Sequence, residues 1–399
     1  MERYNDDILK RLDINDSERK DWYYARQYVL DVLPPLDRTG IEPSSSTHVN
    51  VVTNSTDNLM LAIIRQICLI AHYPNFNEET GANRTIITIC TKNPSDALNK
   101  IKAYRYLGNL LKYCKISFVD NDKKSTIQDE SLPLDIEFEF SKKTIDSYTE
   151  SDGVFLQIIK IENIKDSINV QECFDVTKGM LVNMVYTIGA EIDNLPATDN
   201  DNIERYSTAL NMFCYRLKHE VIREKWNNSA KPNKDGKYNK INIKNQLSSI
   251  FCADCFESKL KAIVDTKNIS VLECFQNDFD NIMKQLCKKE NINVLACCEH
   301  ARWNVEKLIL GFKPLSSEDW YNIESCFGTE RNKRISKLKK DEDNPRHIDL
   351  CSCRDLRRVH PGNMKYDYFL MLAMPQFFYL RLTNHISLIY VEINGKHLN

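Results

Sequence analysis

Short apolar, β-branched runs alternate with longer apolar periodicities over the first 170 residues of the chain. Five of these runs predict strands, at 48–52, 85–90, 115–119, 135–140 and 154–161. Residues 59–71 lie between the first two runs and are apolar on all sides, as in a helix buried between a sheet and another layer. Asn93, Pro94 and Asp96 form a typical helix start, and we expect the helix that follows to be amphipathic as far as Leu111.

Strand and helix alternate in the order that predicts a parallel sheet, and after residue 170 the pattern becomes helical. This second part contains an apolar stripe from Val176 to Ile192. It also contains three further stretches with helical periodicity, at 206–222, 247–264 and 270–287. The predicted divisions are a helical lead-in (1–45), a Rossmann-like domain (46–170), a helical connector (171–289), a mainly α domain (290–385) and a C-terminal strand or tail (386–399). The expected fold class is therefore α/β plus α.

The amino-acid composition is that of a globular protein and excludes several other classes. The 399 residues include 54 Lys and Arg against 56 Asp and Glu, and 42% are hydrophobic, which excludes a disordered chain and a globally basic nucleic-acid binder. The 11 glycines compare with about 28 expected at this length, so phosphate-binding glycine loops are scarce.

Targeting signals and cysteine content point to a compartment. No apolar run approaches the about 20 residues that cross a bilayer, and the N-terminus lacks the apolar core of a signal peptide. We therefore expect a cytoplasmic protein with no membrane partner. In that setting the 14 cysteines indicate mostly reduced, buried thiols rather than a disulfide framework.

The turn after the first strand is one candidate site. It reads Thr53, Asn54, Ser55, Thr56, Asp57, and in a Rossmann-like sheet it would lie at the carboxyl ends of the strands, where ligands bind. The turn has none of the glycines that a dinucleotide needs, so NAD binding is disfavoured here, and a polar helix cap is the plainer interpretation. An enzyme that acts on a nucleotide through this turn stays as the alternative function.

A second candidate site lies on the helix predicted at 292–310. At 100° per residue its core face comprises Val294, Cys298, Ala301, Val305, Leu308 and Ile309. His300, Trp303 and Lys307 fall on roughly the opposite side, where the following segment, a ligand or a partner must cover them. Gly311 is placed to end the helix. The stretch from Arg331 to Arg358 contains ten basic and five acidic residues. Such an excess of positive charge is typical either of a solvated loop or of an anion site.

These residues resemble the RyR domain, the repeat module first described in ryanodine receptors, over roughly 290–380. The motif positions are Glu299, His300, Trp303, Lys307, Gly311, Phe312, His347, Leu350, Asp355 and Leu356. Ile348 stands where the family usually has Pro, and Phe312 where it has Trp, so apolar packing is kept but an indole-specific contact is not. Bacterial relatives often join this domain to a Rossmann-like domain through a helix like 248–260. The resemblance implies a sensor of nucleotide-like or NAD-derived signals in prokaryotic immunity, and no catalyst.

On this basis we expect a ligand-binding sensor rather than an enzyme. Trp303 would offer a ring face to a base. The remaining predicted ligand residues are His300, Lys307, Phe312, Arg346, His347 and Asp349. No cofactor is expected beyond the nucleotide-like, anionic ligand.

The sequence also bears on metal ions, nucleic acids and protein partners. Cys252 and Cys255 form one C-x-x-C pair without a second, which is weak evidence for zinc. The local basic charge comes without a helix-turn-helix or finger pattern, so no nucleic-acid partner is expected. The β-rich run 386–393 is a candidate surface for self-association, and a protein partner from the same operon is the other expected contact.

Overall fold

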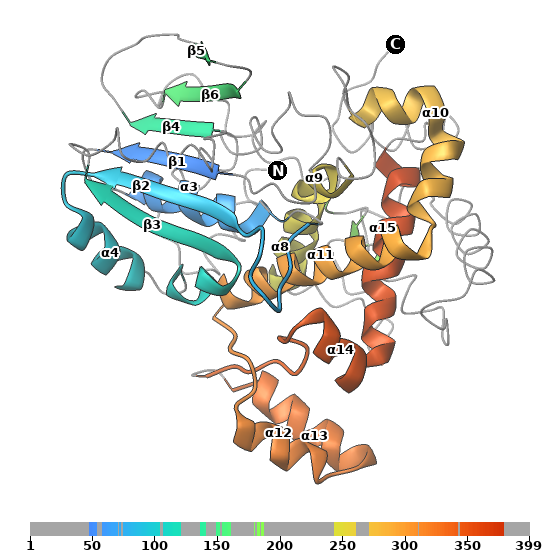
Figure 1. Ribbon diagram of the computed structural model, residues 1–399. Coiled ribbons are helices and arrows are strands. Elements are labelled where there is room, and N and C mark those ends of the chain that lie inside the picture. Colours follow the sequence, from blue (N-terminus) through green and yellow to red (C-terminus); the bar gives the residue numbers. More distant parts are fainter. Residues whose placement is uncertain are drawn as a thin grey trace.

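A computed structural model of the chain describes residues 48–53, 58–70, 72, 75–103, 107–120, 136–140, 149–151, 154–160, 179, 182–183, 185–186, 243–260, 271–309, 311–341 and 344–378 (Figure 1). The predictions for 1–45, 54–57, 206–222 and 386–393 lie outside these residues. Within them, a sheet with two helices on one side and a further group of helices packed against it agree with the α/β plus α class.

The sheet contains six strands, in the order β3-β2-β1-β4-β6-β5. Their bounds are β1 His48–Thr53, β2 Thr85–Thr91, β3 Cys114–Asp120, β4 Ile136–Phe140, β5 Thr149–Ser151 and β6 Val154–Lys160. The five predicted strands are confirmed and pair in parallel, whereas β5, which was not predicted, adds antiparallel to β6. Every residue of β2 is buried, as its continuous apolar pattern requires in a parallel sheet. The strand order reverses at β1, which lies between β2 and β4.

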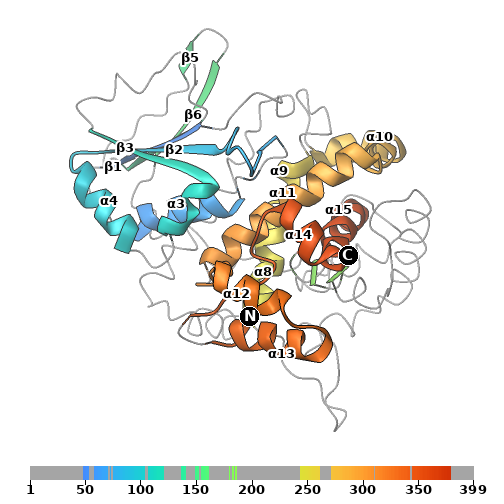
Figure 2. The same ribbon diagram turned by 60° about the horizontal axis from the view of Figure 1, so that its bottom comes forward.

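Two helices, α3 (Asn58–Ile70) and α4 (Pro94–Ala103), lie on the same side of the sheet (Figure 2). α3 is buried along its length from Met60 onward except at Arg65, because it packs on α8 and α11 as well as beneath the sheet. α4 begins at Pro94 as predicted. The expectation of one amphipathic helix as far as Leu111 is wrong: a separate 3-10 helix, η1 (Leu107–Lys112), follows, and Leu111 is 50% exposed. Gly108 and Asn109, both poor α-helix formers, lie within this 3-10 helix.

The helical group is built around α11 (Lys289–Ile309). Its other members are α8 (Ile243–Asp254), α9 (Phe256–Leu260), α10 (Val271–Leu286), α14 (Cys353–Val359), η3 (Pro361–Asn363) and α15 (Met364–Phe378). α11 contacts α3 and η1 on the sheet side and α8, α10, α14 and α15 on its other sides (Figures 1 and 2). In the described part of the chain, no helix is both long and apolar enough to cross a membrane.

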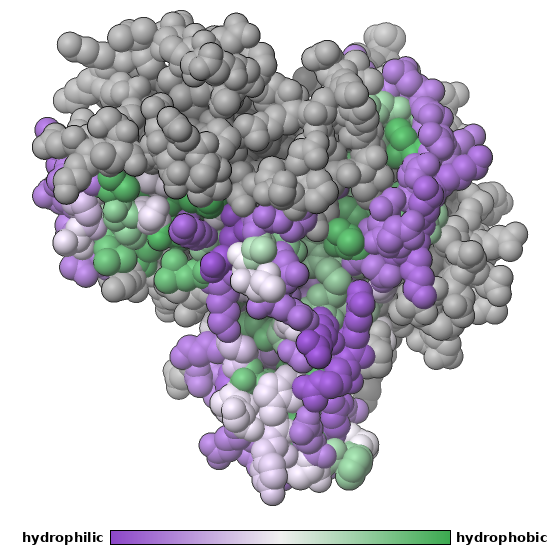
Figure 3. All heavy atoms as spheres, in the orientation of Figure 1, coloured by the Kyte–Doolittle hydropathy of each residue, from purple (hydrophilic) through white to green (hydrophobic). Residues whose placement is uncertain are grey.

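Two short helices, α12 (Ser317–Glu324) and α13 (Gly328–Lys339), project from this group (Figure 1). α13 has no buried residue, and this end of the molecule is coloured mostly hydrophilic to intermediate (Figure 3). The chain then returns to the end of α11. There the Lys313 backbone N–H donates to the Pro345 carbonyl at 2.9 Å, and the His347 N–H donates to the Lys313 carbonyl at 3.1 Å. This pairing brings His347 beside the residues that follow α11.

Candidate ligand-binding site

A cavity of about 710 Å³ lies beside the C-terminal half of α11. It brings together four of the predicted ligand residues, which are Trp303, Lys307, Phe312 and His347. The other lining residues are Asn183, Tyr186, Asn245, Ser248, Ser249, Lys339, Lys340 and Tyr366. The described lining therefore comes from residues 183 and 186, from α8, α11 and α15, from the C-terminal end of α13, and from the segments at 312 and 347 that adjoin α11.

Aromatic rings form one side of this cavity. The His347 ring meets Trp303 edge-on at 5.0 Å between centroids and Phe312 edge-on at 5.9 Å. Gly311 makes this cluster possible, because its φ of +85° ends α11 and turns the chain back so that the Phe312 N–H donates to the Lys307 carbonyl. The predicted role of Gly311 at the helix end is confirmed.

Positive charge is concentrated in the same cavity. Lys307, Lys339 and Lys340 all line it, and among the described lining residues there is no carboxylate. The Lys307 ammonium lies 5.2 Å from the centre of the Trp303 ring, within cation–π range. Burial, and then repulsion from Lys307, lowers the pKa of Lys339. A bound anion would relieve that repulsion.

Behind Lys307 runs a chain of buried ion pairs. Lys259 on α9 lies 2.6 Å from one Glu299 oxygen, and Arg302 lies 2.8 Å from the other. Arg302 also lies 2.7 Å from Glu306, whose second oxygen is 2.6 Å from Lys307. The first four side chains are fully buried and that of Lys307 nearly so.

The charges along this chain alternate and do not cancel. Burial opposes ionisation of Glu299, but Arg302 and Lys259 overcome it and lower the Glu299 pKa to about 2. The Glu306 pKa is also lowered, against burial, by Lys307 and Arg302. With both carboxylates ionised, three cations face two anions. One positive charge is left over, and Lys307 is the member of the chain that reaches the cavity.

The two predicted histidine ligands are uncharged at neutral pH. Burial lowers the pKa of His300 to about 4, and burial, followed by the charge on Lys339, lowers that of His347 to about 3. The His347 Nδ1 accepts a hydrogen bond from the Asp349 N–H at 3.2 Å. A neutral His347 ring with this tautomer carries its proton on Nε2, as a neutral donor.

Three predicted ligand residues are engaged elsewhere and do not line the cavity. His300 lies behind Trp303, with its ring stacked on the indole at 5.8 Å and its Nε2 2.9 Å from the Cys351 carbonyl. Arg346 instead donates to both oxygens of Asp319 at 2.9 Å.

Asp349 is likewise occupied. It accepts hydrogen bonds from His360 at 2.7 Å and Asn363 at 2.8 Å. His300, Arg346 and Asp349 thus each have a partner within the protein and lie outside the described lining of the cavity.

The predicted core face of α11 is confirmed at Cys298, Ala301, Val305, Leu308 and Ile309, which are all buried, and is wrong at Val294, which is 44% exposed. The outer face is covered as expected, since His300 and Lys307 are buried as well. Neighbouring elements enclose the second half of the helix, whereas its first turns are partly exposed. Its charged residues can be buried because they pair with one another and with Lys259.

Residue periodicity missed most of the cavity lining. Lys339 and Lys340 were noted only as members of a basic run, and Tyr186 and Tyr366 carried no signal. The aromatic rings of these two tyrosines lie 6.1 Å apart, although 180 positions separate them in the chain. A local pattern cannot register such a distant pairing.

The other candidate chemistry finds less support. Thr53 ends β1, where the strand order reverses, and 54–57 lie outside the described residues. Within those residues, no three His, Cys, Asp or Glu side chains are grouped to hold a metal ion. Cys252 and Cys255 are separate, buried thiols whose pKa values burial raises.

Comparisons of the sequence and the structure with family models, curated proteins and solved structures give no match.

Proposed function

We propose that this protein binds a small anion that carries a planar ring, of the nucleotide or NAD-derived kind, in the cavity beside α11, and that it acts as a sensor. The observation that carries the proposal is the chain of ion pairs that ends at Lys307 with one positive charge uncancelled. A phosphate is the natural partner for that charge, and Trp303 beside it offers a ring face for a base.

The histidines favour binding over catalysis. A general base works best with a pKa near the working pH, whereas that of His347 is about 3. Near pH 7 such a ring is a weak proton acceptor. Its contribution is then a neutral hydrogen bond, which suits recognition.

The resemblance to the RyR domain supports the same assignment, since Trp303, Lys307, Phe312 and His347 are motif positions and line the cavity. The strand order 3-2-1-4 in the sheet is that of a Rossmann-like domain. A role in prokaryotic immune signalling rests on the resemblance alone.

A thermal-shift assay combined with mass spectrometry tests the proposal. The panel is ATP, ADP, ADP-ribose and NAD, with adenosine as the uncharged control and pyrophosphate as the control without a ring. We expect at least one nucleotide to raise the melting temperature more than either control, without turnover. Formation of a product would identify an enzyme instead, and the absence of any shift would exclude a nucleotide ligand.

The location of the ligand is tested separately. Binding that survives His347→Ala and Lys307→Met but is lost in Ser55→Ala or Asp57→Ala would place the ligand at the end of β1.

A further inference from the structure

Among the described cysteines, one pair forms a disulfide, Cys297 on α11 with Cys353 at the start of α14, and the other ten form none. Seven of these ten thiols are buried and thus unreactive in the folded state. A single disulfide among so many reduced cysteines is not typical of a small secreted fold. In the cytoplasm, where we expect this chain, disulfides are usually transient and redox-sensing.

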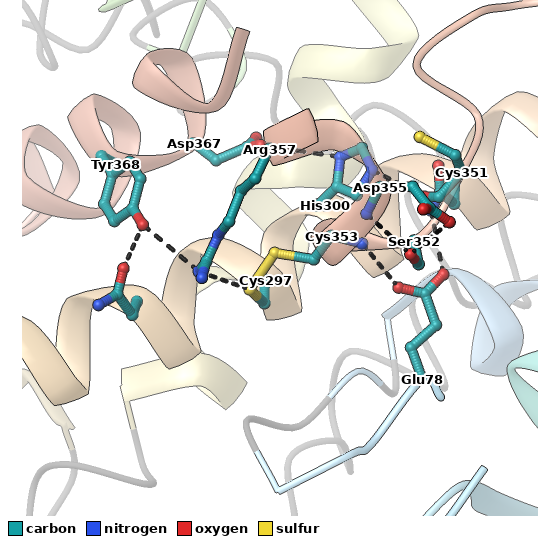
Figure 4. The surroundings of a disulfide bond; sticks show 12 residues. Glu78, Cys297, His300, Cys351, Ser352, Cys353, Asp355, Arg357, Asp367 and Tyr368 are labelled. Atoms are coloured by element: carbon teal, nitrogen blue, oxygen red, sulfur yellow. Dashed lines mark hydrogen bonds and ion pairs between the residues drawn. A yellow bond between two sulfur atoms is a disulfide. The ribbon is translucent and has the colours of Figure 1, made fainter. Parts of the chain in front are cut away.

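The disulfide is placed for exchange with an external thiol. Cys297 is half-buried, whereas Cys353 is buried, so Cys297 is the more exposed member of the pair. The Arg357 guanidinium donates to the Cys297 Sγ at 3.4 Å (Figure 4), and a neighbouring cation favours the thiolate form of a cysteine. Nearby Cys351 is a poor competitor, because burial raises its pKa to about 12.

The bond also holds a segment that supports the cavity. Cys353 lies two residues after Cys351 (Figure 4). The Cys351 carbonyl accepts from His300 at 2.9 Å and from Asn304 at 2.7 Å. The His300 ring in turn stacks on Trp303, which lines the cavity.

The backbone N–H of Cys353 also donates to the carboxylate of Glu78 at 3.1 Å. Glu78 precedes β2, so this bond links the segment to the part of the chain that leads into the sheet. Burial raises the pKa of Glu78, and the carboxylate also accepts from Tyr113. Loss of the disulfide would remove a covalent link between α11 and this segment and leave hydrogen bonds and packing to hold it.

We propose that Cys297–Cys353 is a reversible redox pair that sets the order of the 347–353 segment and, through His300 and Trp303, the ligand affinity of the cavity. The link to affinity rests on the proposed function, whereas the link to the order of the segment does not. A thiolate of a small or protein dithiol attacks the Cys297 sulfur, and the Cys353 sulfur leaves and takes up a proton. The second thiol of the reductant then displaces Cys297, whose departing thiolate Arg357 stabilises. Two electrons pass to the protein, and the dithiol becomes a disulfide.

The experiment uses the full chain as oxidised and as reduced with dithiothreitol, with alkylation and mass spectrometry to identify the thiols. Hydrogen exchange of peptides over 344–360 reports the order of the segment, and calorimetry with ADP-ribose as the probe reports affinity. We expect Cys297 and Cys353 to become alkylated while the protein stays folded, and exchange in 344–360 to become about tenfold faster. ADP-ribose should bind about tenfold more weakly, within the usual range of coupling between sites. Oxidised glutathione should reverse each change.

Cys297→Ser should reproduce the reduced state without reagent, and Cys287→Ser, a half-buried cysteine outside the pair, should match the wild type. Equal exchange rates in the oxidised and reduced chains, or labelling of the pair only after unfolding, would overturn the inference. Altered exchange with unchanged ADP-ribose affinity would overturn its link to the cavity. If neither form binds ADP-ribose, the choice of ligand fails, but the exchange rates still decide whether the pair controls the segment.

Discussion

The Nζ atom of Lys307 lies 2.6 Å from Oε1 of Glu306, at the point where the buried ion pairs of α11 meet the cavity. The Glu306 carboxylate is shared, because Arg302 and the Ser248 hydroxyl both bond its other oxygen at 2.7 Å. Lys307 is thus held in position by a carboxylate that only partly neutralises it. A cation fixed in this way is pre-organised for an anionic ligand, since little side-chain entropy remains to be lost on binding.

Removal of Arg302 should be severely destabilising. Arg302→Met leaves two buried carboxylates without their shared partner, and breaking a buried ion pair typically costs about 3–5 kcal/mol of unfolding free energy. Urea denaturation measures the loss. Arg334→Met is the matched control: its pair with Glu330 is exposed, so the expected loss is below about 1 kcal/mol. An Arg302→Met protein as stable as the control would show that the buried pairs contribute little.

Arg346→Gln should lower stability and leave ligand affinity unchanged. The guanidinium bonds both oxygens of Asp319, which also caps the start of α12 with Ser316. Hydrogen bonds to charged groups are worth about 1.5–3 kcal/mol each, and a loss near the lower end is expected because Arg346 is partly exposed. Denaturation and calorimetry on the same sample separate the two effects. A marked drop in affinity at unchanged stability would restore Arg346 as a ligand contact.

His72 should make the fold sensitive to acid. Burial lowers its pKa from 6.5 to about 3. The nearby charges of Lys259 and Arg302 also lower this pKa, whereas the hydrogen bond to the Cys68 carbonyl raises it. Between these two pKa values the unfolded chain binds the extra proton, so stability falls as the pH decreases below 6.5. At pH 5 the cost is about 2 kcal/mol.

The measurement compares wild type and His72→Gln by denaturation at pH 7 and pH 5. The wild type should lose about 2 kcal/mol more than the variant between the two pH values. Equal losses would mean that His72 takes up its proton in the folded protein near the ordinary pKa.

The sheet could be predicted from sequence because parallel strands buried on both faces need continuous apolar runs, as in 85–90. The start of α4 at Pro94 and the end of α11 at Gly311 followed from local backbone preferences. Both kinds of signal are contained within a few neighbouring residues.

The burial of α11 could not be predicted in the same way. Periodicity assigns a charged residue to the surface, and the partner that makes Glu299 a buried residue is Lys259, 40 positions earlier and on another helix. The same holds for the cavity, where Tyr186, Lys339 and Tyr366 meet only in the folded chain. Periodicity singled out Trp303 and Lys307 on the predicted helix, whereas His347 was found because the resemblance supplied the long-range information.

Lys307→Met is the variant on which the account depends most. The substitution keeps the unbranched stem, so packing changes little. It also removes the ion pair with Glu306, which keeps its bonds to Arg302 and Ser248. One charged hydrogen bond to the ligand is lost, worth about 1.5–3 kcal/mol. Affinity should fall about 10- to 100-fold. Added salt should also weaken binding to the wild type, because partly exposed charges are screened.

Titration calorimetry of the panel nucleotides into wild type, Lys307→Met and Lys333→Met tests the central claim most directly. Lys333 is an exposed lysine of α13 that does not line the cavity, so its variant controls for the loss of one positive charge. The account predicts that a nucleotide binds the wild type and Lys333→Met alike and binds Lys307→Met at least about tenfold more weakly. Equal affinity for all three proteins would contradict it.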